Sequence, residues 1–233
     1  MESAETSLLR AAAFDMDGLM FNTEEVYFHV GTRLMERRGC VYTPELCSAI
    51  MGCPPQVSFE TMIRWNHLSD TWQELHEESE RTFFEILDTY LAPMPGLFVL
   101  LDFLEAHDIP RAICTSSSRA VMRGVTSRFD LEKRFNFTIT ADDITQGKPH
   151  PEIYLRAADR FGVKPGEMMV LEDSCNGCRA GANAEAFVVA VPAEHSRHMD
   201  FSCASMIAGA LDDPKILEKF LNQSRGNSVV TEW

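Results

Sequence analysis

The chain has 233 residues, of which 45% are hydrophobic and 24% are charged. These proportions are ordinary for a globular protein and exclude a collagen-like or coiled-coil chain, and the length is sufficient to bury a core without disulfide staples. The net charge of -14 argues against a general binder of nucleic acids or anionic membranes, so an anionic ligand would have to be met by local positive charge.

The seven cysteines are an odd number, scattered along the chain. No uncharged apolar run approaches the roughly 20 residues of a membrane-spanning helix, and residues 1–6 carry no basic charge. We therefore expect a cytoplasmic protein with reduced thiols. Cys175 and Cys178 form a C-x-x-C pair, but without a second pair we expect them to pack beneath a helix rather than bind metal.

The first half of the chain is predicted to be one strand followed by helices. Residues 8–14 form a short apolar run that stops at Asp15, as a buried strand stops at a turn. No comparable run follows until the Pro- and Gly-containing stretch 93–96. Between them, the spacing of apolar side chains predicts four helices, over 24–38, 44–51, 56–67 and 71–90.

The second half alternates helices with short apolar strands. We expect helices over 97–105, 119–129, 151–161 and 175–184, and strands over 111–115, 137–140, 168–171 and 187–191. This alternation predicts a parallel sheet covered on both faces, hence an α/β fold with a Rossmann-like core and an inserted all-helical domain. The predicted divisions are a core from 1–22 and 92–222, a helical domain from 23–91, and a polar tail from 223–233.

Polar residues gather where the predicted strands end. Because the carboxyl ends of parallel strands share one edge, where open α/β sheets bind ligands, these side chains should meet there. Each neighbouring pair of these polar residues, taken alone, is typical of a turn or a helix cap. Their coincidence at successive strand ends, however, predicts one acidic site with a single lysine. The residues are Asp15, Asp17, Ser116, Ser117, Lys148, Glu172 and Asp173.

These segments resemble the four motifs of the haloacid-dehalogenase-like (HAD) hydrolases. The motifs lie in residues 14–24, in 115–117, in Lys148 with the two following prolines, and in 172–177. They have the order and spacing of that family, and the helical insertion resembles its small helical cap. The branch most similar to this chain contains phosphatases and mutases related to β-phosphoglucomutase and pseudouridine-5'-phosphatase.

The resemblance implies roles for the two aspartates that follow the first strand. Asp15 would be the nucleophile that attacks phosphorus and forms an aspartyl-phosphate. Asp17 would protonate the leaving oxygen and then activate water. The backbone carbonyl of Asp17 would have to turn toward a metal, so the chain should bend just after Asp15, and Gly18 supplies the conformational freedom for this bend.

The resemblance also implies a magnesium site and a phosphate site. Asp15, the backbone carbonyl of Asp17 and Asp173 would hold Mg²⁺, with Glu172 acting directly or through water, because oxygen ligands suit this ion. The phosphoryl group would be bound by Ser116, backbone N–H groups near Ser117, and Lys148, which neutralises charge. Thr23 belongs to the first motif and is expected among the substrate-binding residues.

The implied activity is a Mg²⁺-dependent phosphatase of small sugar or nucleoside phosphates, acting as a monomer. A β-phosphoglucomutase-like mutase is the alternative, but such mutases carry a His where this chain has Tyr27, and a cap Arg that is absent here before Arg64. A metal-free dehalogenase would lack the counterpart of Asp17. A non-catalytic phospho-ligand binder would have lost the nucleophile or the lysine, and this chain has both.

Overall fold

The structure is a computed structural model that describes residues 8–50, 53–194 and 196–221. The chain divides into two compact units, one formed by 1–21 with 93–233 and the other by 22–92. The predicted tail at 223–233 lies outside the described residues. Within the described ranges, none of the helices combines the length and apolar character that a membrane crossing requires.

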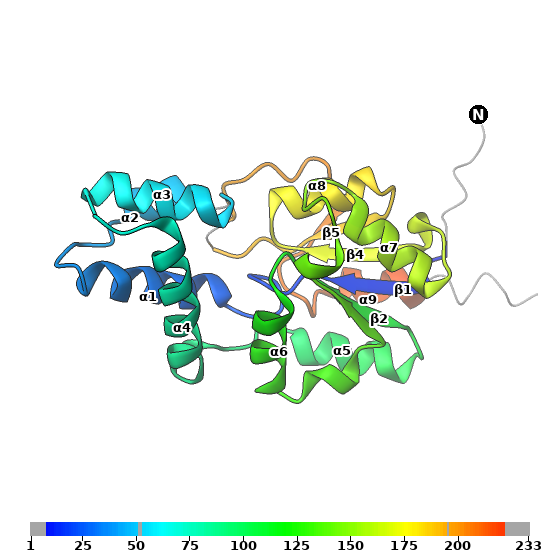
Figure 1. Ribbon diagram of the computed structural model, residues 1–233. Coiled ribbons are helices and arrows are strands. Elements are labelled where there is room, and N and C mark those ends of the chain that lie inside the picture. Colours follow the sequence, from blue (N-terminus) through cyan, green and yellow to red (C-terminus); the bar gives the residue numbers. More distant parts are fainter. Residues whose placement is uncertain (1–7, 51–52, 195, 222–233) are drawn as a thin grey trace, which may run out of the picture. The chain divides into compact units, whose positions relative to one another are not determined.

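The first unit is built on a six-stranded sheet in the order β3-β2-β1-β4-β5-β6, in which every pairing is parallel (Figure 1). This confirms the predicted α/β fold. The two-residue β6 was not predicted, because a strand so short has no periodic signal. The strands are β1 Ala11–Phe14, β2 Arg111–Cys114, β3 Phe137–Ile139, β4 Met168–Glu172, β5 Phe187–Ala190 and β6 Met206–Ile207.

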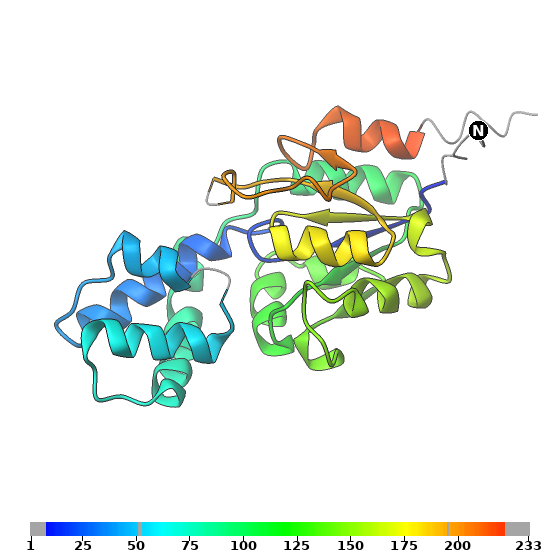
Figure 2. The ribbon, with the colours of Figure 1, turned by 90° about the horizontal axis from the view of Figure 1, so that it is seen from above.

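Helices cover both faces of this sheet: α7 and α8 lie on one face, and α5 and α9 on the other (Figures 1 and 2). Alternation along β1 explains the two layers, because Ala11 and Ala13 pack in the same cluster as Tyr154 of α7 and Cys178 of α8. Cys178 is fully buried there and Cys175 is partly buried. The helices are α5 Leu97–Ala106, α6 Arg119–Ser127, α7 Glu152–Phe161, α8 Cys175–Asn183 and α9 Pro214–Leu221.

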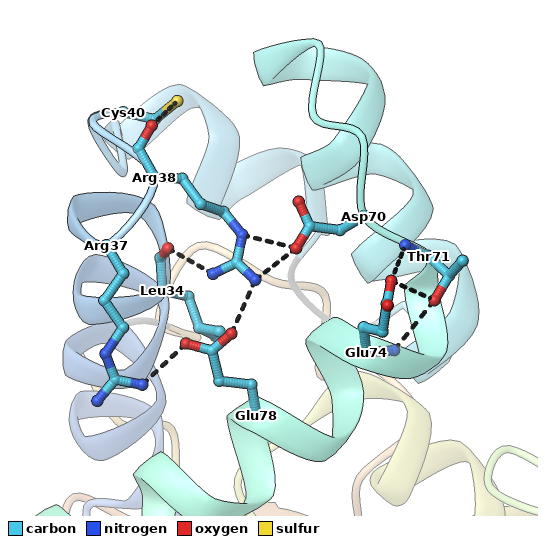
Figure 3. A network of polar contacts seen from close by, with 8 residues as sticks. All are labelled: Leu34, Arg37, Arg38, Cys40, Asp70, Thr71, Glu74 and Glu78. Carbon is cyan, nitrogen blue, oxygen red and sulfur yellow. Dashed lines mark hydrogen bonds and ion pairs between the residues drawn. The ribbon is translucent and has the colours of Figure 1, made fainter.

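The second unit is all-helical. In α4, Thr71 is the N-cap rather than the first helical residue, and it forms a capping box with Glu74 (Figure 3). Next to it, Arg38 binds Asp70 at 2.6 Å and Glu78 at 2.7 Å, which ties the end of α1 to α4 (Figure 3). The helices are α1 Thr23–Glu36, α2 Pro44–Ile50, α3 Pro55–Asn66 and α4 Trp72–Tyr90.

Candidate active site

The candidate site lies at the carboxyl ends of the two central strands, β1 and β4. The backbone N–H of Asp15 donates to the Leu171 carbonyl at 3.0 Å, so the pairing of β1 with β4 continues for one residue beyond the end of β1. The chain then turns at once, because the Met16 carbonyl accepts hydrogen bonds from the N–H groups of Met20 and Phe21. Gly18 in this turn has φ +77°, the left-handed conformation that the predicted bend requires.

Three acidic side chains meet at this edge. Asp15, Glu172 and Asp173 are all buried, and each offers one oxygen within 4.8 Å of the others'. Lys148, from the loop before α7, forms ion pairs with Asp15 and with Glu172, the latter at 2.6 Å, and its side chain is only 6% exposed. Four of the residues singled out in the sequence therefore lie in one buried cluster.

The electrostatics of this cluster favour a further cation. Burial raises the pKa of Asp15 well above its usual value, and Glu172, Asp173 and Asp17 raise it further, although Lys148 opposes them. Burial alone would lower the pKa of Lys148, but attraction to Asp15 and Glu172 outweighs it and the net shift is upward. One ammonium among these carboxylates leaves excess negative charge, and three buried carboxylates offer oxygen ligands of the kind that Mg²⁺ prefers.

Asp17 does not belong to that group of three, and its carboxylate is bound instead by residues of the turn that follows β2. Its Oδ2 accepts hydrogen bonds from Thr115 Oγ1 at 2.9 Å and from Ser117 Oγ at 2.8 Å. Its Oδ1 is buried and has no hydrogen-bond partner among the residues that the structure describes. Thr115 lies in the second motif but was not among the predicted site residues, although it is the first polar residue after β2 and that position was the available signal.

The remaining predicted binding residues lie in different surroundings. Ser116 is exposed, whereas its neighbours Thr115 and Ser117 contact Asp17. The next residue, Ser118, was not among the predicted binding residues; it caps α6 by accepting a hydrogen bond from the Val121 N–H at 3.3 Å. Thr23 is the first residue of α1 in the helical unit, where it is buried and its hydroxyl is unpaired within the described part of the chain.

Glu172 has a second set of contacts that the sequence did not reveal. The hydroxyl of Tyr154 donates to Glu172 Oε1 at 2.5 Å, and both side chains are fully buried. The hydroxyl of Ser174 lies 3.1 Å from Oε2 and also caps α8 by accepting from the Gly177 N–H. No signal in the pattern marked Tyr154, since it looked like an ordinary core residue of α7.

Known proteins that are similar to this chain in sequence or structure support the family resemblance of its motifs. The family model described as "Haloacid dehalogenase-like hydrolase" matches residues 12–191. A "Phosphorylated carbohydrates phosphatase" of Thermotoga maritima is 34% identical over 76% of this chain and 82% of its own length. A "Probable pseudouridine-5'-phosphatase" of Drosophila melanogaster is 33% identical over 87% of this chain and 90% of its own. The structure of a β-phosphoglucomutase from Clostridium difficile has the same fold, with a TM-score of 0.73 at 20% identity over 94% of this chain and 100% of that one.

Proposed function

Because the chain belongs to the haloacid dehalogenase-like hydrolases, we propose that it is a Mg²⁺-dependent phosphatase of small phosphorylated metabolites, acting through an aspartyl-phosphate on Asp15. The observation that carries this proposal is the buried cluster itself. A carboxylate at the end of the central strand is paired with Lys148 and faces further carboxylates. Another acid, Asp17, is held nearby with one oxygen unpaired among the described residues.

The acidic group would hold the metal through Asp15, Glu172 and Asp173, with the backbone carbonyl of Asp17 as the fourth ligand expected from the sequence. When bound, Mg²⁺ would reduce the repulsion between the Asp15 carboxylate and an anionic phosphoryl group. Lys148 would add a fixed positive charge beside the nucleophile, where negative charge builds up during the transfer.

In the first step, a carboxylate oxygen of Asp15 attacks phosphorus while the bond from phosphorus to the substrate oxygen breaks. That leaving oxygen takes a proton from the Asp17 carboxyl group and departs as an alcohol. In the second step, Asp17 takes a proton from water, and the resulting hydroxide attacks phosphorus. The bond from Asp15 to phosphorus breaks, inorganic phosphate leaves and the Asp15 carboxylate is restored. Asp17 is protonated again, as it was at the start.

A phosphatase is preferred to a mutase because of Tyr27. In the helical unit the Tyr27 ring stacks on Phe83 with centroids 4.7 Å apart, so this position packs as an aromatic pair where mutases carry a His. The names of the two sequence relatives support sugar phosphates and nucleoside phosphates as the substrate class. We propose a cytoplasmic monomer that takes these small molecules and neither nucleic acid nor membrane.

A panel of phosphorylated metabolites tests this proposal. Phosphate release should be observed with Mg²⁺ for at least one hexose, pentose or nucleoside monophosphate. The panel should include β-glucose-1-phosphate with a bisphosphate primer, because a mutase would isomerise it without net release of phosphate. Isomerisation faster than release would favour the mutase, and activity toward none of these compounds would contradict both.

A further inference from the structure

Tyr154 contacts two residues of the buried cluster, Glu172 and Lys148. It lies in α7, which packs on the face of the sheet, and its side chain is completely buried. Its hydroxyl donates to Glu172 Oε1 at 2.5 Å, and the Lys148 ammonium lies 5.2 Å from the centre of its ring. Because Tyr154 and Glu172 are both shielded from solvent, water cannot easily replace this hydrogen bond.

The hydrogen bonds of Glu172 are divided unequally between its two oxygens. Oε1 accepts from Tyr154 at 2.5 Å and from Lys148 at 2.6 Å, whereas Oε2 has longer contacts to the Ser174 hydroxyl at 3.1 Å and its N–H at 3.4 Å. A carboxylate oxygen has about two lone-pair sites. Each oxygen therefore has two contacts, but those of Oε2 are longer and weaker, so Oε2 is the oxygen that a cation can engage more easily.

The carboxylate of Glu172 also packs closely against the first turn of α8. A Cβ atom placed at Gly177 would lie 1.9–2.0 Å from the carboxylate atoms of Glu172, so the first turn of α8 fits against that group only because residue 177 is glycine. Gly177 thus leaves room for the carboxylate, and the Tyr154 hydroxyl binds it through Oε1.

We infer that Tyr154 is a positioning residue, whose hydroxyl holds Oε1 of Glu172 and thereby presents Oε2 to the cation of the site. This inference rests on the proposed function, because it assigns Tyr154 a part in binding the metal on which that function depends. Tyr154 touches neither substrate nor cation. It acts through Glu172, as groups that hydrogen-bond to metal ligands commonly do.

The substitution Tyr154→Phe tests the inference with little disturbance to packing. It keeps the ring, and with it the contact to Lys148, and removes only the hydroxyl. We expect the dissociation constant for Mn²⁺, measured without substrate by the electron paramagnetic resonance of the free ion, to rise roughly tenfold or more. Tyr42→Phe, which removes a partly buried hydroxyl in the helical unit, is the matched control and should leave the Mn²⁺ affinity unchanged.

A double-mutant cycle separates positioning from a merely structural effect. If the hydroxyl acts through Glu172, Tyr154→Phe should weaken Mn²⁺ binding much less in a Glu172→Gln background than in the wild type. Equal weakening in both backgrounds would overturn the inference, as would wild-type affinity in a folded Tyr154→Phe protein. Failure of the wild type itself to bind Mn²⁺ would overturn the proposed metal site together with it.

A crystal structure of the wild-type protein grown with Mn²⁺ gives a test that does not depend on the variant folding. We expect Glu172 Oε2 to face the ion, directly or through one water, while the Tyr154 hydroxyl remains on Oε1. An ion ligated by Oε1, or a Tyr154 hydroxyl turned away from Glu172, would contradict the inference even if the site binds metal as proposed.

Discussion

The hydroxyl of Thr115 lies 2.9 Å from Oδ2 of Asp17, although the two residues are 98 positions apart in the chain. They meet because β1 and β2 are neighbours in the sheet and both end at the same edge. Thr115 is completely buried, and its Oγ1 also accepts the Ser117 N–H at 3.0 Å. The orientation of the proposed acid/base residue is thus set by the turn that follows β2.

Removing these donors should slow catalysis more than it harms stability. Thr115→Val and Ser117→Ala each delete one hydrogen bond to Asp17, and we expect kcat to fall by roughly tenfold or more because small misplacements of a catalytic group are costly. Ser127→Ala removes an exposed hydroxyl at the end of α6 and is the control. Unchanged kcat in both test variants would show that Asp17 is oriented by other contacts.

The position of the site was predictable from the sequence, but its internal contacts were not. Short apolar runs ending in acidic residues, as at Asp15 and Asp173, mark strand ends whatever the tertiary packing. The directions of the side chains that follow these strand ends cannot be predicted from the sequence. Ser116 looked equivalent to its neighbours, yet it is exposed while Thr115 and Ser117 reach Asp17, because successive residues of a turn point in different directions.

Gly177 should tolerate no side chain. In Gly177→Ala the new Cβ would overlap the carboxylate of Glu172, so we expect a loss of about 1–3 kcal/mol in the free energy of unfolding and weaker Mg²⁺ activation. Gly209→Ala is the matched control, because no atom lies within 4 Å of a Cβ built there. Denaturant unfolding and Mg²⁺ titration of activity measure the two effects, and equal behaviour of both variants would contradict the steric argument.

Removing the metal should abolish activity reversibly. EDTA is expected to silence the enzyme and excess Mg²⁺ to restore it, because the acidic cluster would otherwise repel an anionic substrate. Ca²⁺ should inhibit, since it prefers more ligands and a looser geometry and would misplace Asp15. Initial rates in the three conditions are the measurement. Full activity in EDTA would contradict the proposed metal dependence and revive a dehalogenase-like mechanism.

The ion-pair network of the helical unit should make stability depend on pH. The hydrogen bond to Arg38 lowers the pKa of Glu78, burial opposes it, and Arg37 lowers the pKa further. Because the folded pKa lies below the unfolded one, the stabilisation is present above the unfolded pKa and is lost as the pH falls through the folded pKa. Glu78→Gln should therefore cost about 1 kcal/mol at neutral pH and little in strong acid.

Urea unfolding of the wild type and of Glu78→Gln between neutral and acidic pH measures this difference. Glu77→Gln is the control, because Glu77 is an exposed neighbour in the same helix. A constant difference between wild type and Glu78→Gln across the whole pH range would mean that the Arg38 contact does not depend on the ionisation of Glu78.

The contribution of Tyr154 shows a different limit of sequence reasoning. The spacing of apolar residues over 151–161 predicts a helix with one buried face, and α7 confirms it. By that pattern Tyr154 is an ordinary core residue, and its side chain is indeed completely buried. Its hydroxyl meets Glu172 only because α7 packs on the face of the sheet to which Met168 and Val170 of β4 contribute, a packing relation that neither segment encodes by itself.

Trapping the phosphorylated protein shows whether Asp15 is the nucleophile. Asp17→Asn should still transfer phosphate from an aryl phosphate, whose leaving group needs little protonation, but should fail to activate water. We therefore expect the phosphoenzyme of this variant to accumulate. Borohydride reduction should then convert residue 15, and no other, to homoserine, as read by peptide mass spectrometry.

The comparison variant is Asp15→Asn, which should remain folded, give no adduct and keep less than about a thousandth of the wild-type rate. Phosphoryl label and homoserine at position 15 in Asp17→Asn, and neither in Asp15→Asn, are the results that the covalent mechanism predicts. Release of the aryl leaving group by Asp17→Asn with no adduct, or with an adduct on another residue, would contradict it.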